Sequence, residues 1–444
     1  MIVGGGFGGL LAARGLRRAD VDVTLIDRQN FFLFQPLAYQ VATGSLSSVE
    51  IAFPLRQALR RQRNTEVVLG EATGFDLAAR TVTVSDLPTG EERAIAYDVL
   101  GVAGGSRYSY FGHDDWAHLA PELKTLDGAL DLRDRILLAF ESAEFEADIQ
   151  AQKERLTFVI VGGGPTGVEL AGALREIAVN DIPEDFRHID TKMARIILVQ
   201  GGDRLLPAFP KELSERAKKD LEGMGVEVRL NTRVTNVDDD GLWIGEERLL
   251  AGTVFWAAGV QAPPIMKTLG VPLDKAGRVA VSPDLSIPGH PNVFVLGDCA
   301  DVKQKDGSSV PGLAPAAIQM GQFIAKLISK EIGQSPKPPR PTFEYWDKGT
   351  MATIGKRRAV ADIKGLKFGG FFAWFLWGAV HLMFLVSFRN KIAVMLNWMY
   401  QYLTHGREAR LITGDAKIKL RKVLTPEQVA HRPKQTAAAE SSNA

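Results

Sequence analysis

Two glycine-rich turns in this sequence have the composition that binds the diphosphate of a dinucleotide. In the first turn, a short apolar segment leads into Gly4, Gly6 and Gly9. The first glycine permits a tight turn, the second lets a pyrophosphate approach the backbone, and the third lets helix and strand pack closely. The next apolar segment ends at Asp27, where a carboxylate can accept hydrogen bonds from ribose hydroxyls. We predict that these four residues bind the adenosine end of a cofactor.

The second turn repeats this pattern with Gly162, Gly164 and Gly167, after an apolar segment at 156–161. The strand that follows ends at Gln200, where an acidic residue is usual. A glutamate there would bind the ribose diol and repel a 2′-phosphate, and a neutral glutamine removes that repulsion. We therefore expect NADPH to be used measurably, with NADH still preferred. The alternative is that Gln200 is an ordinary solvated strand end.

A third short apolar segment, at 292–296, ends in Gly297 and Asp298. Placed after two dinucleotide motifs, its carboxylate can reach a ribityl hydroxyl of a flavin. This element assigns the first turn to FAD and the second to the nicotinamide nucleotide. The only cysteine is Cys299, so a disulfide, a four-cysteine metal site and a paired-cysteine redox motif are excluded. Redox chemistry must therefore come from a bound cofactor, and we predict no metal site.

The charge balance argues against nucleic acid as a partner, because 53 Lys and Arg face 52 Asp and Glu. Residues 355–424, however, contain 13 basic and three acidic residues. Within them, residues 368–388 form a run of 21 residues that is rich in aromatics and has no charged side chain. Basic flanks around an apolar, aromatic run are typical of segments that bind an anionic membrane surface.

Length alone does not decide how this run meets the membrane, since 21 helical residues would reach about 31 Å, enough to cross the hydrocarbon core. A single transmembrane span is therefore an alternative. Gly378 and His381 interrupt the run, and the stretch that follows places its polar residues near one helical face. These polar residues are Asn390, Asn397, Gln401 and Thr404. We predict that residues 368–403 anchor the protein to the membrane surface without spanning it.

Four further segments indicate which protein family the chain resembles. They are residues 30–56, 109–116, 256–260 and 314–321. With the three motifs in this order, the chain resembles the type II NADH:quinone oxidoreductases, which belong to the flavoproteins with two dinucleotide-binding domains. Residues 35–44 carry the most specific part of this resemblance. Two positions depart from the family pattern: Gly104 replaces a usual threonine, and Pro315 replaces the first glutamine of a quinone-site pair.

The resemblance implies a non-proton-pumping enzyme of the respiratory chain with non-covalently bound FAD. NADH would pass a hydride to the flavin, which would then reduce a membrane quinone by two electrons. The resemblance also implies cofactor contacts by Gln40 and Gly259, and hydrogen bonding or proton relay near the quinone by Glu169 and Gln319. Glu169 could instead only stabilise its helix N-terminus. The enzyme would be peripheral, on the cytoplasmic face of the cell inner membrane, and a homodimer is left open.

The expected fold is α/β, with two Rossmann-like dinucleotide-binding domains (the FAD/NAD(P)-binding fold) and a C-terminal helical membrane-anchoring segment. The expected units are 1–115 and 271–335 for the two parts of the FAD-binding domain, 116–270 for the NADH-binding domain, 342–424 for the quinone-site and membrane-anchoring region, and 425–444 for a disordered tail. Only three residues precede Gly4, which leaves open whether the true start lies upstream of Met1.

Two other functions compete with this interpretation. Disulfide reductases and sulfide:quinone oxidoreductases need more than one thiol, and the single Cys299 excludes both. Cys299 itself is most simply a small core residue. The second competitor is a non-catalytic, nucleotide-responsive FAD protein that acts as an interaction partner. The complete second glycine motif and the membrane segment favour the enzyme.

Overall fold

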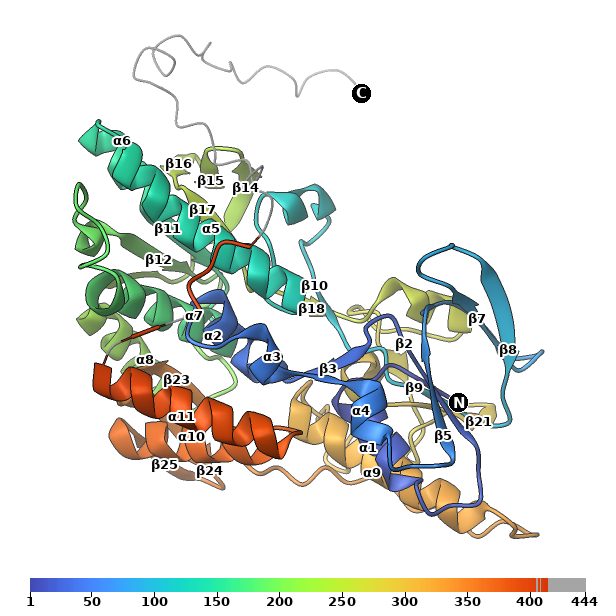
Figure 1. Cartoon of the computed structure of the whole chain (residues 1–444). Helices are drawn as coiled ribbons and strands as arrows, with labels where there is room; N and C mark the ends of the chain where they lie inside the picture. Colours follow the sequence, from blue (N-terminus) through green and yellow to red (C-terminus); the bar gives the residue numbers. More distant parts are fainter. Residues whose placement is uncertain (405, 408, 414–444) are drawn as a thin grey trace, which may run out of the picture.

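The chain folds around two β-sheets that lie side by side, each at the centre of an α/β unit (Figure 1). The structure is a computed structural model and describes residues 1–404, 406–407 and 409–413. The predicted tail at 425–444 lies outside the described residues. The α/β fold with two dinucleotide-binding units is confirmed.

The first sheet carries three of the predicted cofactor residues at one edge. In sheet order its strands are β20 (Ser286–Ile287), β21 (His290–Val295), β9 (Leu100–Val102), β1 (Ile2–Val3), β2 (Val23–Asp27) and β5 (Thr65–Leu69). All neighbours pair in parallel except β20 with β21. Because parallel strands end on the same side of a sheet, Gly4 after β1, Asp27 at the end of β2 and Asp298 after β21 all lie on that side.

Helices α1 (Phe7–Gly15) and α9 (Ala314–Glu331) pack closely beside this sheet. A Cβ on Gly321 of α9 would lie only 2.2 Å from the carbonyl oxygen of Gly8 in α1, so the two helix backbones nearly touch. An antiparallel sheet of β6 (Glu71–Asp76), β7 (Thr81–Ser85) and β8 (Glu92–Ala96) extends this unit. In the sequence, the connection from β2 to β5 contains β3 (Phe31–Leu33), α2 (Ala38–Ala42), α3 (Ser48–Ile51), β4 (Ala52–Pro54) and α4 (Leu55–Leu59).

The second sheet is entirely parallel. In sheet order its strands are β13 (Val226–Arg229), β12 (Arg195–Val199), β11 (Thr157–Val161) and β17 (Thr253–Trp256). Alternate side chains of β11 enter different cores. Phe158 and Ile160 pack with the helices, and Val159 and Val161 pack on the opposite face. The helices of this unit are α5 (Leu126–Phe145), α6 (Ile149–Arg155), α7 (Pro165–Glu176) and α8 (Lys211–Met224), and the opposite face is covered by β14 (Val234–Asp238), β15 (Gly241–Ile244) and β16 (Glu247–Leu250).

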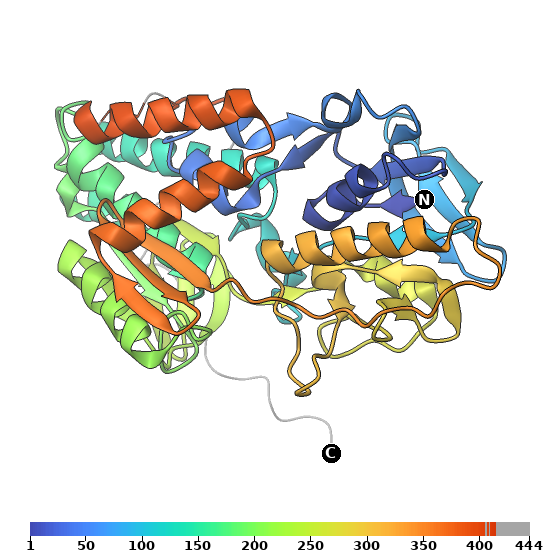
Figure 2. The same ribbon diagram turned by 90° about the horizontal axis from the view of Figure 1, so that it is seen from below.

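After α9 the chain crosses from the first unit back to the second in an extended segment (Figure 2). It then forms an antiparallel sheet and a helical hairpin beside α7 and α8. These elements are β23 (Thr350–Gly355), β24 (Arg358–Ile363), β25 (Leu366–Gly369), α10 (Phe371–Phe384) and α11 (Phe388–Thr404). At Gly172 of α7 a Cβ would lie 1.6 Å from the carbonyl oxygen of Ile354, so the α7 backbone lies directly against β23.

The uncharged run at 368–388 does not form one helix. Its first residues complete β25, α10 begins at Phe371 after Gly370 adopts a φ of +82°, and α10 ends at Phe384. The 14 residues of α10 reach about 21 Å. Within the part of the chain that the structure describes, no helix has the length and apolar character needed to cross a membrane.

The Gly172 contact predicts a large effect of one methyl group. Gly172→Ala should destabilise the protein by roughly 1–3 kcal/mol, because its Cβ can be placed only if α7 and β23 move apart. Gly223→Ala is the control, since a Cβ on this exposed glycine of α8 meets nothing within 4 Å. We expect the thermal unfolding midpoint to fall for Gly172→Ala and to stay or rise for Gly223→Ala. Equal midpoints for the two variants would show that the α7–β23 contact is not tight.

Candidate active site

The first glycine turn has room for a phosphate and a fixed carboxylate beside it. Gly4 has a φ of +103°, and a Cβ on Gly9 would lie 1.8 Å from the Gly4 carbonyl oxygen. A Cβ on Gly6 would meet nothing within 4 Å, so the space above the turn is open. The Asp27 carboxylate accepts a hydrogen bond of 2.5 Å from the Gly5 N–H. The turn therefore fits the pyrophosphate of a dinucleotide.

The second turn has the same geometry. Gly162 has a φ of +120°, a Cβ on Gly167 would lie 1.9 Å from the Gly162 carbonyl oxygen, and the space around Gly164 is open. Gln200 accepts a hydrogen bond of 2.9 Å at Oε1 from the Gly163 N–H. Gln200 thus bonds to the second turn as Asp27 bonds to the first, and the two turns have equivalent geometry. The interpretation of Gln200 as merely a solvated strand end is therefore incomplete.

Asp298 follows β21 in the short helix η6 (Gly297–Cys299), and its Oδ2 accepts a hydrogen bond of 2.5 Å from the Ser106 hydroxyl. Cys299 is buried, and burial raises the pKa of its thiol to about 12. Its expected role as a small core residue is confirmed. Gly259 has a φ of +69°, and a Cβ there would lie 2.8 Å from the Phe111 ring. A direct cofactor contact by Gly259 stays a prediction.

Glu169 lies on the first turns of α7, is half-buried, and points its carboxyl group toward β23 of the C-terminal unit. The Thr353 N–H donates to Oε1 over 3.4 Å. Burial raises the pKa of Glu169 to about 8, although the Thr353 N–H and the Trp377 indole of α10 both act to lower it. Burial, and then the charge of Glu169, raises the pKa of Tyr39 well above its usual value. The site therefore holds a carboxyl group that can keep its proton at neutral pH.

Aromatic rings connect the first glycine turn with α10. Phe7, at the start of α1, lies 5.8 Å from the Phe34 ring, and Phe34 lies 6.2 Å from His381. The His381 ring stacks on Trp377 at 4.1 Å, and burial lowers its pKa to about 4. His381 is therefore neutral at physiological pH. Phe34 and Trp377 are each 3% exposed, so these rings form a packed aromatic cluster between the first glycine turn and α10.

Gln40 is buried, and both ends of its amide are engaged. Its Nε2 donates to the Tyr39 hydroxyl over 2.9 Å, and its Oε1 accepts from the Trp398 indole of α11 over 2.7 Å. The bond with Trp398 links α2 to the helical hairpin. The implied contact of Gln40 with the cofactor stays a prediction.

Gln319 is engaged in a similar way. Its Nε2 donates to the Trp346 carbonyl oxygen and its Oε1 accepts from the Trp346 N–H, each over 3.0 Å. It thereby holds the crossing segment against α9. Glu169 and Gln319 lie on different helices and bond to different segments, so their predicted cooperation at the quinone is untested.

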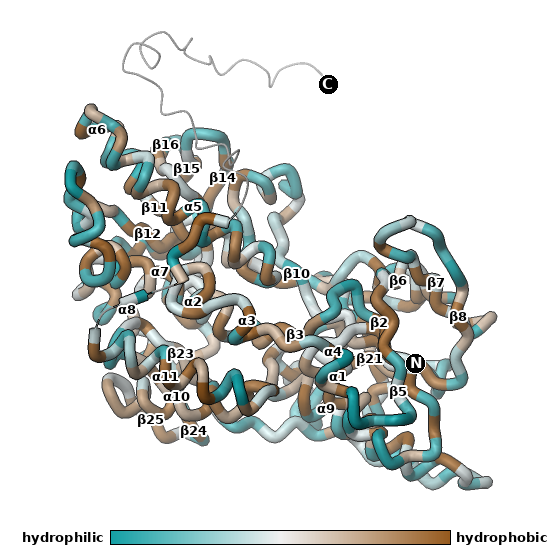
Figure 3. The backbone as a smooth tube through the Cα atoms, viewed as in Figure 1, coloured by the Kyte–Doolittle hydropathy of each residue, from teal (hydrophilic) through white to brown (hydrophobic). Residues whose placement is uncertain are grey.

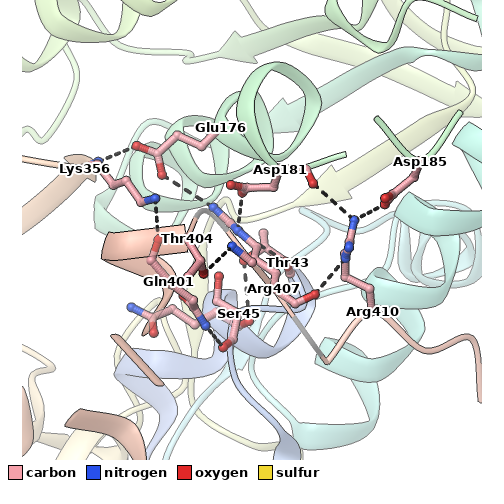
Figure 4. A network of polar contacts seen from close by, with 12 residues as sticks. Thr43, Ser45, Glu176, Asp181, Asp185, Lys356, Gln401, Thr404, Arg407 and Arg410 are labelled. Carbon is pink, nitrogen blue, oxygen red and sulfur yellow. Dashed lines mark hydrogen bonds and ion pairs between the residues drawn. The ribbon is translucent and has the colours of Figure 1, made fainter. Parts of the chain in front are cut away.

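An ionic network joins the segment that follows α11 to the end of α7 and to the turn after β23 (Figure 4). No motif of the sequence indicated this network. Arg407 is 6% exposed and forms ion pairs with Glu176 and Asp181, and it donates to the Thr43 carbonyl oxygen over 3.2 Å. Lys356 donates from Nζ to the Gln401 carbonyl oxygen. Both cations belong to the basic stretch at 355–424 that the sequence assigns to the membrane surface. The spacing of Lys356 and Arg407 in the sequence does not indicate that they bind the rest of the protein and not the membrane.

The helical hairpin presents apolar side chains to the outside. We define the C-terminal apolar face as the exposed large side chains of α10 and α11: Phe371, Phe372, Phe375, Met383, Phe388, Ile392, Met395, Leu396, Met399, Tyr400 and Leu403. The polar side of α11 faces inward. Asn390 donates to the Glu50 carbonyl oxygen over 2.9 Å, and Asn397 and Gln401 bond to Glu50 and Ser45. Three of the four residues predicted to share a polar face therefore point toward the protein body, while Thr404 is exposed.

Comparison with known proteins identifies the family. Residues 1–321 match the family model described as pyridine nucleotide-disulphide oxidoreductase, and residues 347–408 match the NDH2 C-terminal domain. The chain is 46% identical over 422 residues to the type II NADH:quinone oxidoreductase Ndh of Mycobacterium tuberculosis, covering 93% of this chain and 90% of that relative. The chain belongs to the type II NADH:quinone oxidoreductase family. The resemblance seen in the sequence is thereby confirmed.

Solved structures agree on the fold. The structure of NDH2 from Plasmodium falciparum in complex with NADH has a TM-score of 0.85 and 21% identity, and covers 93% of this chain and 99% of that chain. The sulfide:quinone oxidoreductase of Aquifex aeolicus has a TM-score of 0.68 and 19% identity, and covers 91% and 94%. At these identities the likeness concerns the fold alone. The single cysteine still separates this chain from an enzyme that carries sulfur on paired thiols.

The geometry of the second turn leads to a test of nucleotide choice. Gln200→Glu retains an oxygen that can accept from the Gly163 N–H but adds a charge that repels a 2′-phosphate. We expect the ratio of kcat/KM for NADH to that for NADPH to rise by about tenfold or more. Gln150→Glu, on the exposed surface of α6, adds the same charge elsewhere and should leave the ratio unchanged. An unchanged ratio in Gln200→Glu would rule out a role in nucleotide choice.

Proposed function

We propose that this protein is an FAD-dependent NADH:quinone oxidoreductase that does not pump protons. Family membership supports this activity. The observation that carries the proposal is the presence of two glycine turns of the same geometry, each with open space at its second glycine where a dinucleotide pyrophosphate can lie. When bound, FAD accepts a hydride from NADH and passes two electrons to a quinone. NADPH is a second donor.

The first glycine turn would bind FAD, and the second would bind NADH. In the first turn, the open space at Gly6 would take the FAD pyrophosphate, while Asp27 would accept from a ribose hydroxyl. Gly164 and Gln200 would serve NADH in the same way. Asp298 would hold a hydroxyl of the flavin side chain. The domain limits given above are part of this proposal.

Glu169 supplies a proton for the quinone. Quinone reduction consumes two protons, and a carboxyl group with a pKa of about 8 is protonated at neutral pH and can donate one. The Thr353 N–H donates to Oε1 of Glu169, and the His381 ring stacks on Trp377 of the neighbouring helix α10. A quinone ring would approach along these rings.

The C-terminal apolar face docks on the lipid surface, so that a membrane-dissolved quinone can enter from one side. Figure 3 shows stretches of hydrophobic residues along α10 and α11. The large exposed apolar side chains of these two helices favour burial in the lipid interface. The basic residues Arg389 and Lys391 stand at the start of α11, where they would meet anionic lipid headgroups. We place the enzyme on the cytoplasmic face of the inner membrane, and a homodimer is left open.

The activity is tested by separating the two half-reactions in a stopped-flow instrument. The FAD-loaded protein should be reduced by NADH and reoxidised by a soluble quinone. Glu169→Gln should slow reoxidation by about tenfold to a hundredfold, because it removes an acid, and should change reduction little. Reoxidation of the wild type should also slow as the pH rises through about 8, since Glu169 then loses its proton. A protein that holds FAD but transfers no electrons to quinone would contradict the function, and equal slowing of both halves would contradict the role of Glu169.

Membrane docking is tested by flotation with vesicles of phosphatidylcholine and phosphatidylglycerol. Phe372→Glu combined with Phe388→Glu should reduce binding by about tenfold or more, because two exposed rings lose their place in the lipid. Phe145→Glu is the matched control, since this ring is 96% exposed but lies at the end of α5, away from α10 (Figure 1). Equal binding by the double variant and the control would exclude the C-terminal apolar face as the docking surface.

A further inference from the structure

Lys124 is a half-buried cation beside the predicted flavin site that no sequence motif indicated. It lies just before α5, with its side chain 16% exposed. Its Nζ donates to the Ser106 hydroxyl and lies 3.6 Å from Oδ2 of Asp298. The Ser106 hydroxyl itself donates to the same oxygen over 2.5 Å. A hydroxyl and an ammonium group therefore converge on one oxygen of the Asp298 carboxylate.

This arrangement leaves Oδ1 of Asp298 as the oxygen that can accept a hydrogen bond from a ligand. Oδ1 lies beside Gly312, where a Cβ added to the glycine would lie 3.4 Å from that oxygen. Gly312 is exposed, so this side of the carboxylate is reached from the surface of the site. An ionised carboxylate has acceptor positions on both oxygens, and fixing one of them orients the other.

The same ammonium group lies where the two nucleotide units meet. Its Nζ is 5.9 Å from the centre of the Tyr108 ring. The Tyr108 hydroxyl interacts with Thr166, which stands on the first turn of α7 at the second glycine motif. Lys124 thus has Asp298 of the first unit on one side and a residue in contact with the second unit on the other.

We propose that Lys124 is a positioning residue for FAD, which with Ser106 holds Asp298 Oδ2 so that Oδ1 receives a hydroxyl of the cofactor. The inference rests on the proposed binding of FAD. Its physical reason is that a carboxylate with a side chain only 23% exposed needs a compensating cation to stay in a fixed position. Without Lys124, one hydroxyl alone would hold this carboxylate.

The test measures release of FAD from the full-length holoenzyme on dilution, followed by FAD fluorescence. Lys124→Met should raise the dissociation constant of FAD by about tenfold, the effect of one lost charge-assisted hydrogen bond. Lys303→Met is the matched control, because Lys303 pairs with Asp301 over 3.1 Å nearby but its side chain is 58% exposed. The control should stay within about twofold of the wild type, as expected for an exposed ion pair.

A double-mutant cycle shows whether Lys124 acts through Asp298. In the Asp298→Asn background, Lys124→Met should have little further effect, and an undiminished effect there would overturn the inference. Retention of FAD by Lys124→Met at the wild-type level would also overturn it. If Lys124→Met does not fold, Ser106→Ala carries the test: weaker FAD binding supports the inference, and unchanged binding contradicts it. A wild type that holds no FAD would instead contradict the proposed function.

Discussion

The contacts of the C-terminal unit depend on the close approach of α7 to β23. At Gly172 the helix backbone meets the Ile354 carbonyl oxygen with no room for a side chain. Glu169 and Glu176 lie three residues before and four after this glycine, on the same face of the helix. The approach therefore brings both carboxylates to backbone N–H groups of β23 and the turn after it, those of Thr353 and Lys356.

The two carboxylates meet different surroundings on the same helix face. Burial raises the pKa of each, but Glu176 has the cation Arg407 beside it. The groups that act on Glu169 are the neutral Thr353 N–H and the Trp377 indole. A buried carboxyl group with neutral partners retains its proton far more readily than one with a cation. The helix thus carries one carboxylate that pairs with the C-terminal segment and one whose pKa is raised with no cation beside it.

Site residues that follow a strand within a few positions could be predicted from the sequence. Contacts between residues far apart in the sequence could not. The glycine turns, Asp27 and Asp298 follow strands within a few residues, so their places follow from local pattern. Gln40 and Trp398 bond across 358 positions, and no local pattern indicates that pairing. The apolar face of α11 was predictable from its period. That its polar side binds the protein body, that residues 368–388 divide between a strand and two helices, and that Lys124 reaches Asp298 required the structure.

Packing of α7 against the C-terminal unit should keep Glu169 protonated at neutral pH. Infrared difference spectra between the FAD-loaded wild type and Glu169→Gln measure this directly, through the stretching band of the protonated carboxyl group. We expect the band of Glu169 to be present at pH 6 and to disappear with a midpoint near pH 8. A band already absent at pH 6, with a midpoint near the ordinary glutamate pKa of about 4.3, would contradict the claim.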